Sequence, residues 1–252
     1  MHTNSYVYFS LAPNMYATCF DNAVIILDGK NDNYLSLIDD AADYFCFILK
    51  HRFLQKNNKY YCADAPNQTD IHTYWITHFI EKSFIATSIQ STHLTEPLKQ
   101  GGLIGYRWDA KISWKTMSPF AHASAWDIIN AYYMLLKISR SLKRTGISAI
   151  IDLLKKEKFE KNNYDPSEEE IKKLSTAVDA ASILYPKKIY CLVWAATFAV
   201  VALKKGWRCN LVIGVQTNPF YAHAWAECTG KVINDDPMIA QLLSIIFREP
   251  YT

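Results

Sequence analysis

The chain has 252 residues, half of them hydrophobic, including 16 Tyr, 12 Phe and 7 Trp. This length and composition exclude an intrinsically disordered protein and allow one large domain or two smaller ones. The formal net charge of +3 is too small to indicate a nucleic-acid partner.

The beginning of the chain, MHTNSYVYFS, lacks the basic and apolar segments of a secretory signal. The longest apolar run, at 191–203, has 13 residues, whereas a membrane-spanning helix needs about 20. The six cysteines form no CxxC pair and have no disulfide-like spacing, so we expect mostly buried, reduced thiols. These features predict a cytoplasmic protein without a membrane partner.

The first forty residues are rich in strand-forming side chains. SYVYFSL, MYATCF and NAVIILD are expected strands, and the last leads through Gly-Lys-Asn-Asp into NYLSL. Because Gly and Asn-Asp between two apolar runs favour a turn, residues 22–28 and 33–37 are predicted to form a β-hairpin.

Two helices are expected after these strands. IDDAADYFCFILKH has acidic residues in its first turn and a basic end, which suits the helix dipole. In TDIHTYWITHFIEK the spacing of five side chains predicts one helix face, made of Ile71, Tyr74, Trp75, His78 and Phe79. Strands followed by helices predict a small winged-helix-like domain.

Residues 88–107 show no periodicity and contain a proline and a Gly-Gly pair. We therefore expect a first domain at 1–90, a linker at 91–107 and a second domain at 108–252.

Three helices are predicted after the linker. The first is long, with Ser118 as its N-cap and Pro119 at its first position. The second is ISAIIDLLKKEK. Ser167 and Glu170, three residues apart, match a capping box at the start of the third.

A further helix is expected from about 191 to 205, where an apolar run ends in basic residues. It places Cys191 in its first turn, where the unpaired backbone N–H groups and the helix dipole favour a thiolate. NLVIGVQ and AHAWAECT are then predicted strands, and a Thr-Gly turn leads from the second into KVIND.

His223 lies in the second of these strands and Asp235 at the end of the third. A thiolate attacks a carbonyl, an imidazole beside it holds it ionised and protonates the leaving amine, and a carboxylate orients the imidazole. The order of residue types therefore predicts Cys191, His223 and Asp235 as the catalytic residues.

Each of these residues has a structural alternative: a buried cysteine, a hydrogen-bonded strand histidine, and an aspartate in a turn. His122 lies in a similar stretch, PFAHASAW, but at the start of a predicted helix without a nucleophile nearby, so we interpret it as non-catalytic. Cys209, His223 and Cys228 are an alternative metal-binding set. Their spacing matches no standard zinc pattern, so no metal site is predicted.

The stretch from Cys191 to Pro237 resembles the transglutaminase-like cysteine protease of lasso-peptide biosynthesis, the B protein of microcin-type gene clusters. The features that carry the resemblance are Cys-Leu at the helix start, LVIGVQTNPFYAHAW, and GKVIND. In that family the matching positions are the catalytic Cys, His and Asp. No glutamine precedes Cys191 as a papain-like oxyanion donor, so we expect backbone N–H groups at the helix start, including that of Cys191, to bind the oxyanion.

The resemblance implies that the N-terminal domain recognises a leader peptide. Such domains are similar to the small coenzyme-biosynthesis chaperones, and the leader adds beside the third strand and against the last helix. On this chain the corresponding peptide-binding residues are Tyr34, Leu35, Leu37, Tyr74 and His78, for which core packing is the alternative role.

The expected fold class is α+β. It combines an N-terminal winged-helix-like leader-recognition domain, of three strands and three helices, with a transglutaminase-like, papain-like protease domain in which helices pack on an antiparallel sheet. The expected function is cleavage of a ribosomally made precursor at the junction of leader and core during lasso-peptide maturation. A Cys-His-Asp acyltransferase or transglutaminase, and a non-enzymatic peptide-binding scaffold, are the alternatives.

The resemblance also implies an asparagine-synthetase-like cyclase as partner, besides the precursor peptide, and a requirement for ATP. The chain has no GxxxxGK[ST] loop, so we expect ATP to be used by the cyclase or by the complex, and no cofactor in this chain.

Overall fold

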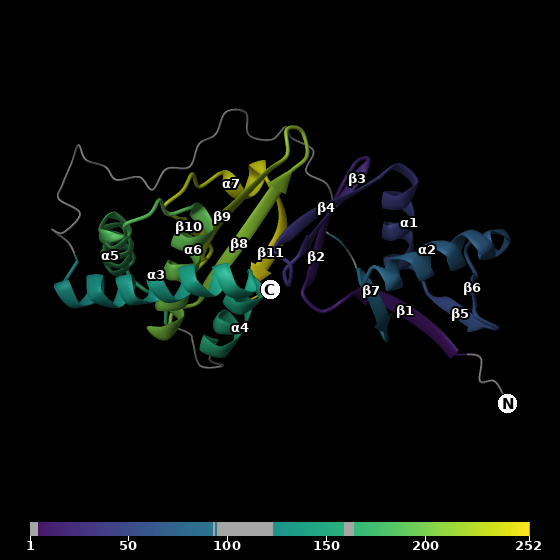
Figure 1. The fold of residues 1–252 in the computed structure, drawn as a ribbon, viewed down its shortest axis with the longest axis horizontal. Coiled ribbons are helices and arrows are strands. Elements are labelled where there is room, and N and C mark those ends of the chain that lie inside the picture. Colours follow the sequence, from purple (N-terminus) through teal and green to yellow (C-terminus); the bar gives the residue numbers. More distant parts are fainter. Residues whose placement is uncertain (1–4, 93, 95–122, 159–163, 252) are drawn as a thin grey trace. The chain divides into compact units, whose positions relative to one another are not determined.

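The structure, a computed structural model, describes residues 5–92, 94, 123–158 and 164–251. The chain divides into two compact units, Met1–Pro97 and Leu98–Thr252 (Figure 1). Most of the predicted linker at 91–107 lies outside the described residues, so its structure stays a prediction.

The described part of the N-terminal unit contains two antiparallel sheets, with strand orders β6-β5-β1-β7 and β2-β3-β4. The hairpin predicted from the Gly-Lys-Asn-Asp turn is confirmed, because β3 pairs with β4 along its whole length. The strands are β1 (Ser5–Leu11), β2 (Met15–Phe20), β3 (Ala23–Asp28), β4 (Asn33–Ile38), β5 (Phe53–Lys56), β6 (Lys59–Cys62) and β7 (Ile85–Ser88).

The helices of this unit are α1 (Asp39–Lys50) and α2 (Thr69–Glu81), with a short 3-10 turn, η1 (Pro66–Gln68), before α2. The expected three strands and three helices are therefore wrong in number for the described residues. The strands β5, β6 and β7 have four residues each, too few for a period-two pattern to stand out. The sequence did contain one signal for the β5–β6 hairpin, the pair Asn57-Asn58. These two residues join β5 to β6 with positive φ angles of 49° and 58°, the conformation of a type I′ hairpin turn.

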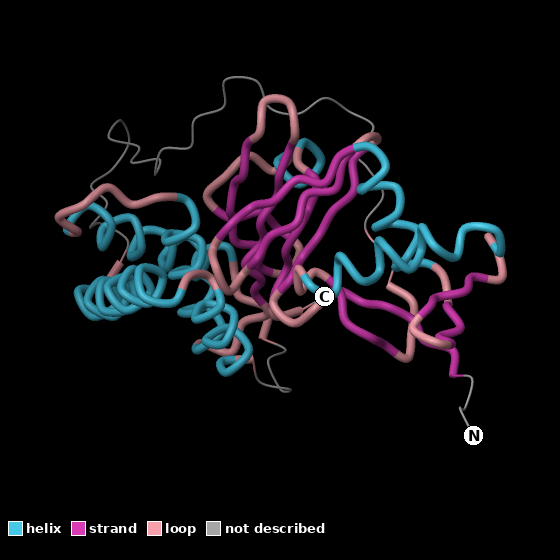
Figure 2. The backbone as a smooth tube through the Cα atoms, turned by 45° about the vertical axis from the view of Figure 1, so that its right-hand side comes forward, coloured by secondary structure: helices cyan, strands magenta, loops and turns pink. Residues whose placement is uncertain are grey.

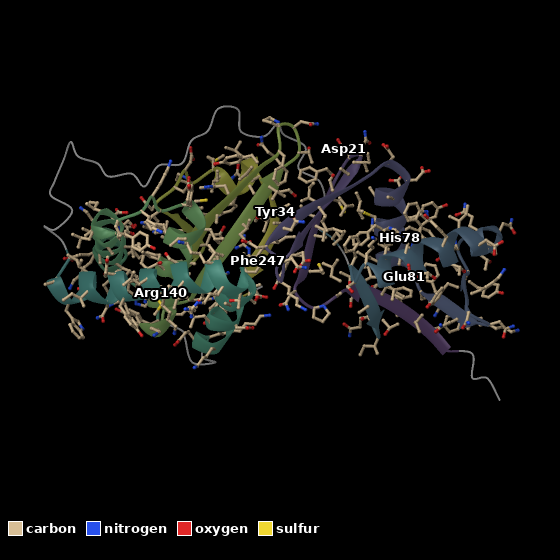
Figure 3. All side chains as sticks on the ribbon, in the orientation of Figure 1. Asp21, Tyr34, His78, Glu81, Arg140 and Phe247 are labelled. Atoms are coloured by element: carbon tan, nitrogen blue, oxygen red, sulfur yellow. The ribbon has the colours of Figure 1, made fainter. Side chains whose placement is uncertain are left out.

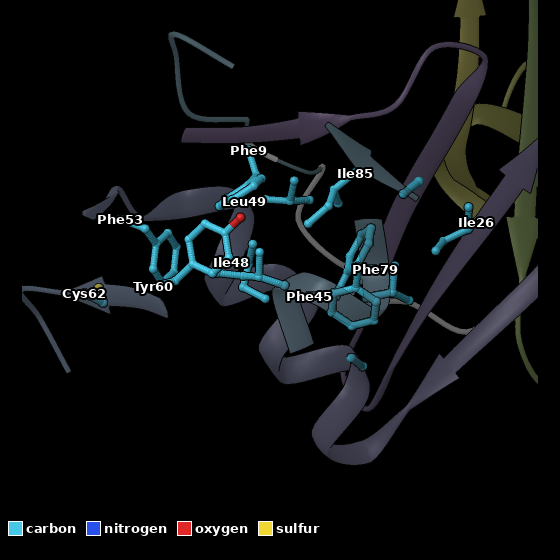
Figure 4. Packing of buried hydrophobic residues seen from close by; sticks show 14 residues of the cluster. Phe9, Ile26, Phe45, Ile48, Leu49, Phe53, Tyr60, Cys62, Phe79 and Ile85 are labelled. Atoms are coloured by element: carbon cyan, nitrogen blue, oxygen red, sulfur yellow. The ribbon is translucent and has the colours of Figure 1, made fainter. Parts of the chain in front are cut away.

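The core of the N-terminal unit lies between α1, α2 and both sheets, and its largest side chains are aromatic (Figure 4). Phe45 of α1 and Phe79 of α2 meet edge to face, with ring centroids 5.1 Å apart. The face of α2 predicted from the spacing coincides only in part with the buried face. His72 and Ile76 are buried, whereas Tyr74 is 61% exposed. Packing against α1 and β6 decides which face of the helix is buried, and the periodicity of the sequence alone does not.

The described part of the C-terminal unit contains a four-stranded antiparallel sheet of order β10-β9-β8-β11. Most of the helices gather on one side of this sheet (Figure 2), so the expected α+β class is confirmed. The elements are α3 (Ala125–Thr145), α4 (Ser148–Glu157), α5 (Glu168–Leu184), α6 (Cys191–Lys204), β8 (Cys209–Gln216), β9 (Tyr221–Cys228), β10 (Lys231–Ile233), α7 (Ile239–Leu242) and β11 (Ser244–Glu249).

Two helix starts show how capping decides where a helix begins. The capping box of α5 is confirmed, because the Ser167 side chain accepts the Glu170 amide and the Glu170 side chain accepts the Ser167 amide. The start predicted for α3 was wrong. Ser124 caps the helix by accepting the amide of Asp127, while Ser118 and Pro119 lie outside the described residues. Among the described residues, no helix combines the length and apolarity needed to cross a bilayer.

Candidate active site

Cys191 is the first residue of α6, as predicted. The backbone of Tyr190 before it is extended, and the Tyr190 carbonyl accepts hydrogen bonds from the amides of Val193 and Trp194. Residues 193–203 are all buried, so the core fixes this helix in place. The thiol therefore lies at the end of a rigid helix where the dipole favours negative charge.

The β9–β10 hairpin brings His223 and Asp235 together. Thr229 and Gly230 form its two-residue turn with φ angles of 51° and 79°, which is type I′ geometry. Asp235 follows the end of β10, and its Oδ2 lies 2.5 Å from Nε2 of His223. The two side chains are 0% and 1% exposed, so water does not compete for this hydrogen bond.

The thiol of Cys191 and the imidazole of His223 form a side-chain hydrogen bond that favours their charged forms. Burial alone lowers the pKa of His223, but hydrogen bonds to Asp235 and Cys191 outweigh it and raise that pKa to about 9. Burial likewise raises the pKa of Cys191. The hydrogen bond to His223, its charge and two backbone amides outweigh burial and lower that pKa. The pair therefore favours thiolate and imidazolium in the pH range between the lowered pKa of Cys191 and the raised pKa of His223.

The two amides that favour the thiolate are those of Leu192 and Ala224. In a two-residue hairpin the residues on either side of the turn form a hydrogen-bonded pair. The amides of Cys228 and of every second residue before it in β9 therefore point toward β10. Because β10 ends at Ile233, opposite Ala226, the Ala224 amide lies two residues beyond the ladder. It donates to the sulfur of Cys191 instead.

Two aromatic rings lie beside the imidazole on the same face of β9. Tyr221 and Trp225 are roughly parallel to His223, with ring centroids 6.1 Å and 6.2 Å from it. Gly214 of β8 lies directly opposite His223, and a Cβ there would come within 2.9 Å of the Trp225 ring. The glycine therefore makes room for the indole that packs next to the catalytic candidate.

The alternative metal-binding set is not assembled. Cys209 and Cys228 face each other directly across β8 and β9 and are buried, while His223 contacts Asp235 and Cys191. Among the described residues, no three His, Cys, Asp or Glu side chains are grouped so that they could hold a metal ion. His122 lies outside the described residues.

The predicted peptide-binding residues lie on two elements of the N-terminal unit, where Figure 3 labels Tyr34 on β4 and His78 on α2. β4 is an edge strand of its sheet in the described part of the chain. Leu35 and Leu37 pack against the core, which supports the core alternative for these two. Tyr74 is exposed and stacks on His78, with centroids 6.1 Å apart, so core packing is wrong for Tyr74.

Sequence reasoning missed Tyr221, Trp225 and the Ala224 amide. The alternation in YAHAW was a signal for the two rings, because Tyr221, His223 and Trp225 fall on one face of a strand. Burial and the charges of Cys191 and Asp235 raise the pKa of Tyr221 to about 12, so its hydroxyl stays neutral beside the charged groups. No pattern in the sequence indicated where β10 ends.

Comparison with known proteins places these residues in a family. The family described as "Transglutaminase-like superfamily" matches residues 133–248. The Microcin J25-processing protein McjB of Escherichia coli is 30% identical over 235 residues, which cover 91% of this chain and 96% of that protein. A search of solved structures found no match. The chain therefore belongs to the lasso-peptide biosynthesis B proteins, the family that its segment around Cys191, His223 and Asp235 resembles.

Proposed function

We propose that this protein is a cysteine peptidase that removes the leader from a ribosomally made lasso-peptide precursor. The observation that carries the proposal is the unbroken line of contacts from the Cys191 thiol through the His223 imidazole to the Asp235 carboxylate. The relation to a protein named for microcin processing supports a peptide substrate.

In the proposed mechanism the Cys191 thiolate attacks the carbonyl carbon of the scissile bond. The His223 imidazolium then donates its proton to the leaving nitrogen, so the core is released with a new amine and the leader remains as a thioester on Cys191. The neutral imidazole next takes a proton from water, the hydroxide equivalent attacks the thioester, and the thiolate leaves. Asp235 holds the imidazole in place and stabilises its charged form throughout.

The oxyanion of each tetrahedral intermediate needs backbone donors. The amides of Val193 and Trp194 bond the Tyr190 carbonyl, and the amide of Leu192 bonds the thiol. We therefore assign the Cys191 amide as the donor at the start of α6.

The N-terminal unit is the proposed leader-binding domain. Its edge strand β4 offers backbone groups to an added strand, and the exposed ring of Tyr74 with half-buried His78 offers apolar contact from α2. Binding of the leader raises the effective concentration of the scissile bond at Cys191 without any new contact there.

The proposed partners follow from the product. A free amine at the start of the core is the group that a lasso cyclase joins to a side-chain carboxyl, so we propose an asparagine-synthetase-like cyclase as the next enzyme. ATP is proposed to be used by that partner or by the complex.

The proposal is tested by incubating the full chain with a candidate lasso-peptide precursor, with and without a lasso cyclase, followed by mass spectrometry. We expect free leader carboxylate and free core, and a loss on the order of 10⁴-fold or more in Cys191→Ala. Cys46→Ser, which removes a thiol of the other unit, serves as control and keeps full activity. Leader joined to an added amine would favour the acyltransferase. Unchanged cleavage by Cys191→Ala, or labelling by iodoacetamide that shows no preference for Cys191 over the buried Cys228, would contradict a thiol peptidase.

A further inference from the structure

A second pair of sulfur atoms meets in the N-terminal unit. Sγ of Cys19, on β2, lies 3.2 Å from Sγ of Cys46, on α1, and both thiols are free and half-buried. The sequence predicted mostly buried thiols, and these two are exceptions because both are partly exposed.

The fold holds these sulfurs together from both sides. Cys19 lies on the face of β2 that packs against the core, and Cys46 lies on the same stripe of α1 as the buried residues Ala42 and Leu49. Both thiols therefore sit at the margin of the core, where the backbone is fixed but a small reagent reaches them.

The two thiols differ in their acidity. A hydrogen bond from Cys19 lowers the pKa of Cys46 against the opposing effect of burial, and the charge of Lys50 assists. The same hydrogen bond and burial raise the pKa of Cys19. Lys50 follows Cys46 by one turn of α1, so its charge favours a thiolate on Cys46, which acts as the nucleophilic cysteine with Cys19 as the resolving one.

We propose that Cys19 and Cys46 form a reversible dithiol–disulfide site that reacts with low-molecular-weight disulfides such as glutathione disulfide. The site lies in a different unit from Cys191 and does not depend on the proposed peptidase activity.

The reaction has two exchange steps. The Cys46 thiolate attacks one sulfur of glutathione disulfide, a Cys46–glutathione bond forms, the reagent's sulfur–sulfur bond breaks, and one glutathione thiolate leaves. That thiolate takes the proton of Cys19, whose sulfur then attacks Cys46 and displaces the second glutathione. Overall the two protein thiols lose two electrons and two protons, and one glutathione disulfide becomes two glutathione thiols.

The product requires little movement, because the sulfurs have to approach by only about 1 Å to reach the length of a disulfide bond. The bond would join the edge strand β2 to α1 across 27 positions of the chain. A loop of this length predicts a rise of roughly 5 °C or more in the melting temperature of the oxidised protein.

The experiment treats full-length Cys191→Ala protein, which lacks the competing active-site thiol, with glutathione disulfide and follows intact mass and peptide maps. We expect a loss of two hydrogen masses without retained glutathione, a disulfide between Cys19 and Cys46, a higher melting temperature, and reversal by dithiothreitol. The buried pair Cys209 and Cys228, directly opposite on β8 and β9, is the internal control and stays reduced.

Two further variants in the same background separate the steps. In Cys19→Ser, or Cys19→Ala if the serine variant melts at a lower temperature, the mixed disulfide cannot be resolved and one glutathione stays on Cys46. In Cys46→Ser neither the mixed disulfide at position 46 nor the disulfide between positions 19 and 46 forms. The proposal is overturned if Cys19→Ser retains no glutathione, if glutathione accumulates on both thiols of the parent, or if Cys209 and Cys228 oxidise first.

Discussion

The imidazole of His223 carries two contacts that reverse the effect of its burial. A buried histidine normally loses its proton more readily, yet the contacts to Asp235 and Cys191 raise the pKa of His223 to about 9. The charged pair of thiolate and imidazolium therefore persists over the pH range between the lowered pKa of Cys191 and the raised pKa of His223.

We expect a bell-shaped dependence of kcat/KM on pH. Activity rises with pH as Cys191 loses its proton, at a pH below that of an ordinary thiol because the pKa of Cys191 is lowered. It falls again near pH 9, where His223 loses the proton needed by the leaving amine. Cleavage rates at low precursor concentration from pH 4 to 10 measure both limbs. A plateau that extends well above pH 9 would contradict the assignment of His223.

Asp235→Asn should slow cleavage and also move the basic limb. The amide cannot stabilise the imidazolium as the carboxylate does, so the pKa of His223 falls and the basic limb shifts to lower pH. We expect kcat/KM to decrease by roughly 10²- to 10⁴-fold. Asp236→Asn, at an exposed neighbouring residue whose oxygen accepts the amide of Met238, is the matched control and keeps the parent profile. A lower rate without the pH shift would assign Asp235 a purely structural role.

At the scale of elements, sequence spacing predicted the helices that carry clear periodicity or capping signals. The starts of α5 and α6 were predictable because a capping box and the residue before a long apolar run mark them. The short strands β5, β6 and β7, and the elements α7 and β11, were missed because four to six residues carry little pattern. The types and order of the three site residues were predictable, but their meeting depends on long-range packing and on the residue at which β10 ends.

Gly214→Ala tests whether the β8–β9 packing positions the site. The added Cβ would lie 2.7 Å from Cβ of Leu243 and 2.8 Å from the Trp225 ring, so the indole beside His223 has to move. We expect a destabilisation of about 1–3 kcal/mol and a lower kcat, measured by denaturant unfolding and by precursor cleavage.

The contrast to this variant is Gly230→Ala. Gly230 has open space around its Cβ position but a φ of 79°, so the substitution costs about 1 kcal/mol through backbone strain alone. Equal losses of kcat in the two variants at matched stability would show that Trp225 does not position the imidazole.

At the scale of the whole molecule, recognition and chemistry are assigned to different units of one chain. The contacts among Cys191, His223 and Asp235 all arise within the C-terminal unit. The proposed chemical step uses no group of the N-terminal unit, so we expect a bound leader to contribute binding energy and not catalytic groups. Damage to leader binding should therefore affect KM and leave kcat nearly unchanged.

Tyr74→Ala tests this separation, because Tyr74 is 61% exposed on α2 and its loss disturbs little of the core. If the ring contacts the leader, KM for the whole precursor should rise by roughly tenfold, while kcat and the melting temperature stay close to the parent values. The matched control is Tyr133→Ala, an equally exposed tyrosine (65%) on α3 of the other unit, for which KM should not change. A short peptide that spans only the scissile bond makes no leader contact, so Tyr74→Ala should hydrolyse it at the parent rate. If Tyr74→Ala hydrolysed the short peptide more slowly to the same extent as the whole precursor, Tyr74 would act on the catalytic step. That result would contradict a separate leader-binding surface.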